Sequence, residues 1–491
     1  MNDSNPIKVP SLAECLEVAS DTEQMIVRPA AIQELGSTLA HLFPGASCYM
    51  IADETTLSSV GSGGVLQDSL SVAGITVAGS SIFPALPTLH ADYLYVGALV
   101  ESLKEKATQV KIDGKTLIPI AIGGGTINDL VKRAAFEAGL RYVCVPTAAS
   151  VDGYTSYGAA LLSNGFKRTF ECPAPIAVIA DSNILAASPA YLSSSGFGDL
   201  ASKIIAGSDW IIAEAAGRAG ALGTELINPL AWAMTQVGLL SALRRSEMAA
   251  QGDVQAVAVL FEALALTGFS MQYLKSSRPV SGCEHLFSHV WEMSDLTMNG
   301  IPVTHGHKVA IGTLCATAVT EQVFSRIEAP RWGQSSINKE YRASSGGDRA
   351  EGENRAQDES KYRDPAERES EVRKAFFGQN AVEDAVKTSI DKLLDQKSAN
   401  LMREKLSDEW GSLRLKVLEQ VMPYQELRAM LKRAGCPVLP EEIALTRNEA
   451  LATARKAQMI RNRYTVLDLA WDFGILEETL AAIEVDKHYL R

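Results

Sequence analysis

The sequence predicts an α/β domain built on a parallel sheet, followed by a helical domain. In the first half of the chain, short apolar runs alternate with helix-like stretches, which is the pattern of βαβ units. After about Ser188, long stretches rich in Ala, Leu and Met replace them, with few strand signals. Because 491 residues exceed what one hydrophobic core usually covers, we expect two domains, residues 1–184 and 185–491.

Each predicted strand is a short apolar run that ends near a Gly, Pro or Asp. The predicted strands are Cys48–Asp53, Leu117–Ile122, Tyr142–Val145 and Ile176–Ala180. The predicted helices are the stretch after Gly125, then Gly198–Ala221, Pro229–Ala250, Val254–Leu274, Val309–Cys315, Ala450–Tyr464 and Val466–Gly474. Residues 338–373 are dense in charge and almost devoid of aliphatic side chains, so we expect a mobile surface insertion or a solvated helix there.

Composition excludes several classes of protein. The net charge of −12 and the pI near 5.3 argue against a general nucleic-acid binder, but they leave room for a locally positive site for an anionic substrate. The seven cysteines are scattered and form no C-x-x-C pair, so neither a disulfide framework nor a thiolate zinc site is expected. With no signal peptide and no membrane span visible, we expect a cytoplasmic protein.

A glycine turn, Gly123-Gly124-Gly125-Thr126, lies between a predicted strand and a predicted helix. Glycines there let backbone N–H groups approach a pyrophosphate closely, and the helix N-terminus adds partial positive charge. The alternative is a tight strand-to-helix turn with no ligand. Asp53 and Glu54, at the end of an earlier strand, offer carboxylates to an adenine ribose, which would favour NAD slightly over NADP.

Four of the seven histidines fall between positions 285 and 307. On a helix, His285 and His289 share a face, and His305 follows before a new apolar helix. Imidazoles are good ligands for zinc, nickel or iron, and a catalytic site usually adds a carboxylate. Asp199 in the segment SGFGD is the candidate. The alternatives are core or cap histidines and a helix-capping Asp; His307 is assigned to an exposed, non-functional position.

A set of segments spread from about Asp53 to Gly474 resembles the sn-glycerol-1-phosphate dehydrogenase family. They are GGGTIND, PTAASVDGYTS, SGFGDLASK, SGCEHLFSH, HGHKVAIGT and RNRYTVLDLAWDFG. That family is part of the superfamily of iron-dependent alcohol dehydrogenases, glycerol dehydrogenases and dehydroquinate synthases. The resemblance implies a Rossmann-like nucleotide-binding domain plus an all-helical metal-binding domain. It also implies a dehydrogenase that interconverts dihydroxyacetone phosphate and sn-glycerol 1-phosphate.

The same resemblance implies the site residues. One divalent ion (zinc, nickel or iron) would be bound by Asp199, His285 and His305. Asp152 and His289 would line the substrate pocket. NAD or NADP would be held by the glycine turn and by residues at strand ends, namely Asp53, Gly123, Gly124, Gly125, Thr126, Asp129, Thr147 and Ser150.

Other expectations concern the substrate and its competitors. Lys203 and Lys308 are candidates for the phosphate of a small triose or glycerol substrate, each with an ordinary exposed lysine as its alternative. The resemblance implies a homo-oligomer, a dimer or larger. The competing functions are a dehydrogenase of glycerol or another alcohol, a dehydroquinate synthase-like lyase and a non-catalytic nucleotide-binding relative. The Asp of GFGD and the string RYTVLDLA argue against the lyase, and the complete Asp–His–His set argues against the non-catalytic relative.

Overall fold

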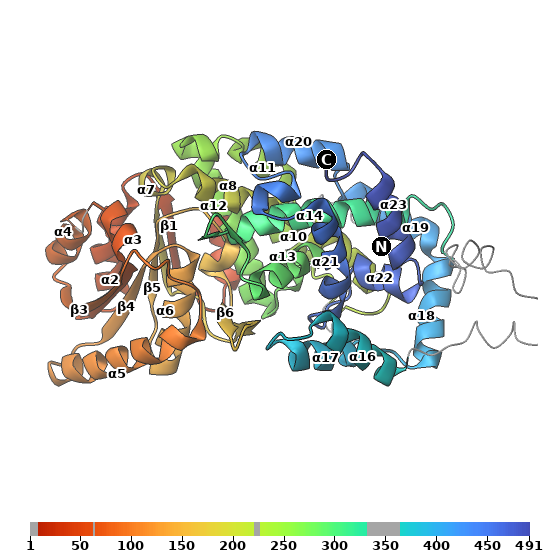
Figure 1. Cartoon of the computed structure of the whole chain (residues 1–491). Coiled ribbons are helices and arrows are strands. Elements are labelled where there is room, and N and C mark those ends of the chain that lie inside the picture. The colour runs from red at the N-terminus through yellow and green to blue at the C-terminus, as the bar shows by residue number, and fades with distance from the viewer. Residues whose placement is uncertain (1–7, 62–63, 220–225, 331–363) are drawn as a thin grey trace, which may run out of the picture.

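The computed structural model describes residues 8–61, 64–219, 226–330 and 364–491, and a parallel sheet dominates its N-terminal part. Figure 1 shows this sheet at one end of the molecule and a mass of helices at the other. The six strands of the sheet, in the order in which they lie side by side, are β1 (Gln24–Arg28), β8 (Ala177–Asp181), β5 (Val143–Pro146), β4 (Leu117–Gly123), β2 (Ser47–Asp53) and β3 (Thr76–Phe83).

Helices cover both faces of this sheet because both faces are apolar. On β4, Ile118 and Ile120 face one layer, which contains α2 (Leu35–Leu42) and α4 (Gly64–Val72). Ala121 faces the other layer, which contains α5 (Val96–Ile112) and α6 (Gly125–Ala138). The smaller elements of this part are α1 (Leu12–Val18), α3 (Glu54–Ser59), α7 (Ser182–Ala186) and the hairpin β6 (Ala159–Ser163) and β7 (Phe166–Phe170).

The four strands expected from the sequence are confirmed as β2, β4, β5 and β8, each shifted by no more than one residue at either end. The expectations omit β1 and β3, which are the two edge strands. An edge strand is less completely covered than a central one, and only Met25 of β1 is buried and no residue of β3. Their apolar signal is correspondingly weak.

After β8 the described residues are helical apart from connecting turns and a short hairpin, β9 (Thr297–Met298) and β10 (Ile301–Pro302). The division near residue 184 stays a prediction. The helices of this part are α8 (Ala190–Ala201), α9 (Lys203–Ala215), α10 (Pro229–Thr235), α11 (Leu239–Ser246), α12 (Val254–Leu274), α13 (Cys283–Met293), α14 (His305–Phe324), α16 (Pro365–Ala375), α17 (Val382–Asp391), α18 (Gln396–Asp408), α19 (Trp410–Gln420), α20 (Tyr424–Arg433), α21 (Arg447–Met459), α22 (Val466–Asp472) and α23 (Leu476–Val485).

Two predicted helices are divided in the structure. The helix predicted to begin at Gly198 falls into α8 and α9 at Ser202, whose hydroxyl donates to the carbonyl of Asp199 at 2.6 Å. The helix predicted over residues 229–250 is interrupted at Gly238, which has a φ of 83°. The helix Val254–Leu274 has the predicted bounds.

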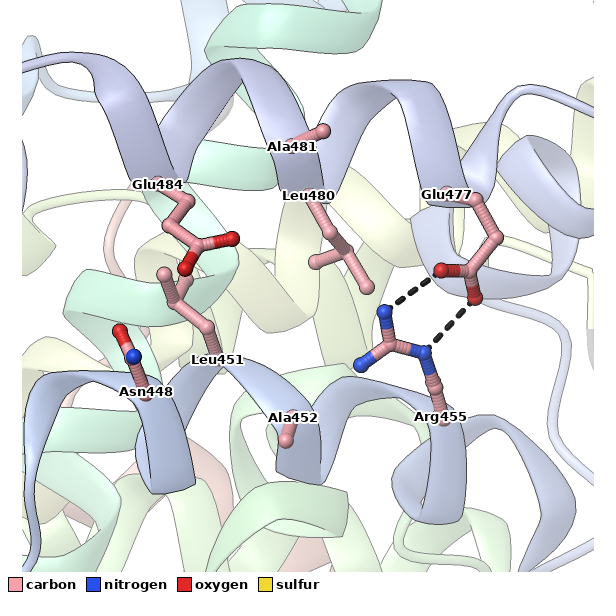
Figure 2. Close-up of a pocket in the computed structure, with 8 residues that line it drawn as sticks. All are labelled: Asn448, Leu451, Ala452, Arg455, Glu477, Leu480, Ala481 and Glu484. Carbon is pink, nitrogen blue, oxygen red and sulfur yellow. Dashed lines mark hydrogen bonds and ion pairs between the residues drawn. The ribbon is translucent and has the colours of Figure 1, made fainter. Parts of the chain in front are cut away.

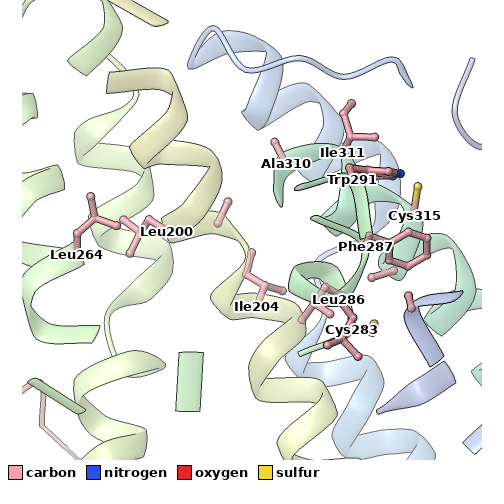
Figure 3. Packing of buried hydrophobic residues seen from close by; sticks show 14 of the residues in the cluster. Leu200, Ile204, Leu264, Cys283, Leu286, Phe287, Trp291, Ala310, Ile311 and Cys315 are labelled. Carbon is pink, nitrogen blue, oxygen red and sulfur yellow. The ribbon is translucent and has the colours of Figure 1, made fainter. Parts of the chain in front are cut away.

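The helix α12 is long and apolar enough, by length and composition, to cross a membrane. However, 72% of its most apolar window is buried inside the protein, which is typical of a core helix. The apolar core continues from there between α8, α13 and α14. Figure 3 shows part of this packing, with Leu200, Ile204, Leu264, Leu286, Phe287, Trp291, Ala310 and Ile311 among the labelled side chains.

The charged segment predicted as an insertion lies mostly outside the described residues. Its last part forms the beginning of α16, as one of the two expectations for this segment allowed. This helix is not merely solvated, because Arg368 is 3% exposed and Val372 is fully buried. The guanidinium of Arg368 donates to Ser389 of α17 at 2.6 Å and lies over the ring of Trp471.

Candidate metal and cofactor site

Asp199, His285 and His305 converge in the helical part of the molecule. One potential ligand atom from each residue lies within 4.8 Å of the other two. Nε2 of His285 is 3.5 Å from Oδ1 of Asp199, and the ring centroids of His285 and His305 are 5.4 Å apart. Asp199 is completely buried and His285 nearly so. The sequence separates these residues widely, and the packing of α8, α13 and α14 brings them together.

Glycines allow the close approach of α8 and α14 on which this cluster depends. A Cβ at Gly198 would lie 2.5 Å from the carbonyl oxygen of Gly306, and a Cβ at Gly306 would lie 1.8 Å from that of Ser195. Any side chain at either position would therefore push the two helices apart. These are the glycines that flank Asp199 and His305 in the sequence, so both segments carry glycine for packing.

Each histidine is oriented by a carboxylate that the sequence analysis did not single out. Glu284 lies 2.8 Å from Nδ1 of His285, and Glu292 lies 2.6 Å from Nδ1 of His305. A proton on Nδ1 shared with the carboxylate leaves the lone pair of Nε2 for an ion, and such partners fix the tautomer of ligating histidines. For Glu292 the sequence did contain a signal, because His285, His289 and Glu292 are spaced so that they lie on one face of a helix.

Lys203 corrects an expectation from the sequence. The sequence left it as either a phosphate-binding lysine or an ordinary exposed one, but it is fully buried, with Nζ 2.7 Å from Oδ1 of Asp199 and 2.8 Å from Oδ2 of Asp152. The backbone N–H of Asp152 donates to the other oxygen of Asp199 at 2.9 Å. Burial alone would raise the pKa of Asp199, but Lys203 and the contact with His285 hold it well below its usual range.

The remaining two histidines of the cluster differ in environment. His289 lies one turn after His285, with ring centroids 6.2 Å apart, and its buried Nδ1 has no hydrogen-bond partner among the described residues. Burial, followed by the charge of Arg461, places the pKa of His289 well below its usual value, so the ring is neutral. His307 is half-buried and hydrogen-bonded to Ser194 at 2.8 Å, which corrects its expected exposed position.

The predicted cofactor residues gather at the carboxyl ends of adjacent strands. Asp53, Gly123 and Thr147 lie at or just past the ends of β2, β4 and β5. After β2 the chain continues to β3, which lies towards one edge of the sheet, and α4 of this connection packs on one face. After β4 the chain continues to β5, which lies towards the other edge, and α6 of that connection packs on the opposite face. This is the switch point at which open α/β sheets bind ligands.

The glycine turn itself has the features of a backbone cradle. Gly124 caps α6, and a Cβ there would meet no atom of the protein within 4 Å. Packing inside the protein therefore does not require glycine at this position, whereas close approach by a ligand would. The turn also adjoins the metal cluster, because a Cβ at Gly125 would lie 2.9 Å from Cγ2 of Val151, next to Asp152.

Other residues of the predicted cofactor set also have partners inside the protein. Asp53 caps α3 by accepting from the N–H of Thr56 at 2.8 Å. Asp129 accepts from the N–H of Ala160 in β6 at 3.2 Å, and Ser150 contacts the hydroxyl of Tyr154 at 3.2 Å. Thr126 lies half-buried in the first turn of α6. The cofactor role of these residues stays a prediction.

Two further features do not coincide with this site. Figure 2 shows a groove between α21 and α23, which the ion pair of Arg455 and Glu477 spans, and none of the predicted site residues lines it. A second buried group, Asp209, Cys283 and Glu284, has metal-ligating residue types. Both carboxylate oxygens of Asp209 accept backbone N–H groups at 2.7 Å, so this carboxylate is already satisfied as a structural cap.

A family model described as iron-containing alcohol dehydrogenase matches residues 26–189. Over these residues the chain is similar to the iron-containing alcohol dehydrogenase family. The matched segment contains the glycine turn and Asp152 and ends before Asp199. The match therefore covers most of the sheet and its strand ends, and it does not reach the helical part of the chain.

Relatives named glycerol-1-phosphate dehydrogenase (NAD(P)+) match a larger part of the chain. The relative from Bacillus velezensis is 36% identical over 222 residues, which is 45% of this chain and 53% of the relative. The relative from Pyrococcus furiosus is 36% identical over 210 residues, which is 43% of this chain and 58% of the relative. The matched part of this chain thus spans about half the length of these curated relatives.

Solved structures share the fold over almost the whole chain. A probable glycerol dehydrogenase from Sinorhizobium meliloti 1021 covers 95% of this chain and 99% of its own, with a TM-score of 0.55 and 16% identity. An iron-containing alcohol dehydrogenase from Thermococcus thioreducens covers 95% and 99%, with a TM-score of 0.54 and 14% identity. The fold of the iron-containing alcohol dehydrogenases, with its Rossmann-like N-terminal domain, therefore extends through the helical part.

Proposed function

We propose that this protein is a metal-dependent, NAD(P)-linked dehydrogenase that interconverts dihydroxyacetone phosphate and sn-glycerol 1-phosphate. The observation that carries the proposal is the convergence of Asp199, His285 and His305 beside Asp152 and the glycine turn. The names of the relatives from Bacillus velezensis and Pyrococcus furiosus support the choice of substrate. We also propose the domain division at residue 184 and assembly as a dimer or larger.

The donor set suits a divalent ion. Two imidazoles whose Nδ1 atoms face carboxylates, together with one buried carboxylate, fit zinc, nickel or ferrous iron alike. When bound, the ion would supply Lewis-acid polarisation of the substrate carbonyl and the nicotinamide would supply the hydride. Asp199, His285 and His305 would hold the ion, and Glu284 and Glu292 would keep both rings in one tautomer.

The polar groups around the cluster would orient the substrate and manage one proton. Lys203 holds the pKa of Asp199 low and contacts Oδ2 of Asp152, whose carboxyl oxygens could accept hydrogen bonds from substrate hydroxyl groups. His289 is neutral, and its Nδ1 has no partner among the described residues. We assign His289 as a proton relay: one ring nitrogen would take a proton from water while the N–H of the other gives its proton to the substrate oxygen, so the ring stays neutral.

The substrate phosphate requires cationic partners other than Lys203, which Asp152 and Asp199 neutralise. We propose Lys308 and Arg461. Lys308 is 3.7 Å from Glu292, and Arg461 interacts electrostatically with both His289 and Glu292. Burial, followed by the positive charge of Arg463, lowers the pKa of Arg461 to about 10, and an anion beside it would relieve that cost.

The test is NADH or NADPH oxidation by purified protein with dihydroxyacetone phosphate, before and after chelation and after addition of Zn²⁺, Ni²⁺ or Fe²⁺. We expect activity that chelation abolishes and at least one of these ions restores. Unphosphorylated dihydroxyacetone is the matched substrate control and should react much more slowly. Equal rates on both substrates would instead identify a glycerol or general alcohol dehydrogenase. Release of inorganic phosphate without net nicotinamide turnover would identify a dehydroquinate synthase-like lyase.

A further inference from the structure

Lys132 is a buried lysine of α6 whose ammonium group is surrounded by oxygen atoms. Its side chain has no exposed surface. Nζ donates to the carbonyl oxygens of Gly153 at 2.9 Å, Ser156 at 3.0 Å and Gly158 at 3.0 Å, and lies 3.1 Å from the hydroxyl of Ser156. Asp129 adds a carboxylate oxygen at 3.5 Å. The group thus occupies the centre of an oxygen cage formed mainly by residues 153–158.

The oxygen atoms surround the ammonium group of Lys132 as ligands surround a bound monovalent cation, and not as in a simple ion pair. Three carbonyl oxygens of one short segment point at the same positive charge, and among the described residues the only carboxylate that pairs with it is that of Asp129, through a longer contact. Carbonyl groups that converge in this way repel one another, and each costs free energy when it is buried without a partner. Lys132 therefore determines the conformation of this segment, rather than simply packing against it.

The segment leads directly to the metal cluster. Gly153, whose carbonyl also accepts from Asn128 at 3.1 Å, follows Asp152. The N–H of Asp152 donates to Oδ2 of Asp199, and its carboxylate contacts Lys203. With Oδ2 held in this way, Oδ1 of Asp199 faces His285. The contacts connect α6, which begins at the glycine turn, to a ligand of the predicted ion.

We propose that Lys132 is an internal cation that positions residues 152–158 and, through Asp152, orients Asp199 for metal binding. Lys132 is a positioning residue, because it contacts neither the predicted ligands nor the glycine turn in the described contacts. The part of this inference that concerns metal affinity rests on the proposed metal site. The part that concerns the conformation of residues 152–158 stands without it.

The test replaces the ammonium group of the Lys132 side chain with a free ammonium ion. Lys132→Ala leaves a cage of the size of an ammonium ion, so we expect Zn²⁺ affinity to fall about 10- to 100-fold, as for other residues that support ligands. Ammonium chloride should restore affinity towards that of the wild type, and tetramethylammonium chloride, whose cation is too large and donates no hydrogen bonds, should not. Amide hydrogen exchange over residues 150–158 should rise in the variant and fall again with ammonium.

A matched control separates positioning from general loss of stability. Lys392 is also buried, 2.6 Å from Asp468 and 2.7 Å from the carbonyl of Gln458, but it lies outside the cage. Lys392→Ala should lower the melting temperature yet leave Zn²⁺ affinity and its response to ammonium as in the wild type. If Lys132→Ala does not fold, Lys132→Gln keeps a shorter, uncharged donor in the cage and should show a smaller loss of Zn²⁺ affinity with a weaker response to ammonium.

The outcomes distinguish this inference from the proposed function. Unchanged hydrogen exchange over residues 150–158 in a Lys132 variant would overturn the positioning role, and so would equal recovery with tetramethylammonium. If the wild-type protein bound no Zn²⁺ but hydrogen exchange still responded to ammonium in Lys132→Ala, the metal site would be refuted while the internal cation stood. Loss of Zn²⁺ affinity with no effect of ammonium would also contradict the cation role.

Discussion

Nζ of Lys203 lies 2.7 Å from Oδ1 of Asp199, and both side chains are fully buried. The same oxygen is 3.5 Å from Nε2 of His285, so a built-in cation and a predicted metal ligand share one carboxylate. Such a charge is too costly to bury alone, and Lys203 keeps Asp199 ionised before any ion arrives. The buried pair of Lys203 and Asp199 therefore keeps this carboxylate charged and ready to bind an ion.

Lys203→Met should make the protein depend on the ion for stability. Removing the ammonium leaves two carboxylates, Asp152 and Asp199, without their partner, which we expect to lower the free energy of unfolding by about 3–5 kcal/mol. Zn²⁺ would then replace Lys203 as the partner of Asp199. The measurement is the melting temperature with and without Zn²⁺, and the rise on adding Zn²⁺ should be larger in the variant. A rise equal to that of the wild type would contradict the shared role of Asp199.

His285→Ala should abolish binding of the divalent ion and all metal-dependent activity while the fold is retained. The ring occupies the centre of the cluster, between Asp199 and His305, so its loss removes a ligand and leaves Glu284 without its partner. Metal content by elemental analysis and circular dichroism measure the two effects. His307→Ala is the control, because His307 contacts Ser194 and is not among the clustered ligand atoms. Metal content like that of the wild type in His285→Ala would refute the ligand assignment.

Gly124→Ala should weaken binding of NADH or NADPH without loss of stability. The backbone of Gly124 has a φ of −78°, which alanine adopts freely, and its Cβ would meet no protein atom within 4 Å. The methyl group would instead enter the space that a pyrophosphate needs for close approach. We expect KM for the nucleotide to rise by an order of magnitude or more and the melting temperature to stay unchanged. In the control Gly97→Ala, in the first turn of α5, nucleotide affinity should stay constant.

How much of this structure the sequence predicts depends on whether an element is recognisable from its own residues or only from contacts with distant segments. Buried central strands such as Leu117–Gly123 and the core helix Val254–Leu274 have nearly continuous apolar patterns, and both are predicted within a residue of their observed ends. The edge strands Gln24–Arg28 and Thr76–Phe83 are missed because little of either is buried. A buried element can be predicted from the apolar pattern of its own residues, whereas an edge strand that depends on pairing with its neighbour cannot.

The site divides in the same way. Composition and spacing suggested only His285 and His305 as a pair of ligands, and a resemblance between segments was needed to add Asp199. No local pattern predicts that Lys203 is buried, because its partners are Asp199 one turn before it and Asp152 on a distant loop. The cage around Lys132 is invisible for the same reason, since it is formed by backbone carbonyls that any residue type supplies.

Arg461→Gln should raise KM for dihydroxyacetone phosphate selectively. Arg461 has a left-handed backbone with φ 61°, a conformation that costs free energy and is often retained at functional sites. Glutamine would bear the same backbone strain while removing the charge and the guanidinium group. We expect KM for the phosphate substrate to rise at least tenfold while the slow rate on dihydroxyacetone is unchanged. Arg455→Gln, in the groove of Figure 2, is the control. An unchanged KM in Arg461→Gln would exclude this arginine from the phosphate site.

Asp209 should make the protein less stable as the pH rises towards neutrality. Burial foremost, and then the charge of Glu284, raise the pKa of Asp209 to about 7, compared with about 3.9 for an ordinary aspartate. The unfolded chain therefore releases this proton at lower pH than the folded protein does. Its contribution to stability is fully present below about pH 4 and is lost as the pH rises through about 7, with a limiting slope of ~1.4 kcal/mol per pH unit.

Asp209→Asn provides the test, because its amide does not titrate. It would lower stability at every pH, since one of the backbone N–H groups of Cys283 and Val466 would then face an NH₂ group instead of an oxygen. The decisive quantity is the difference in unfolding free energy between wild type and variant, measured in urea from pH 5 to pH 8. This difference should shrink as the pH rises. A difference that stays constant over this pH range would contradict the raised pKa of Asp209.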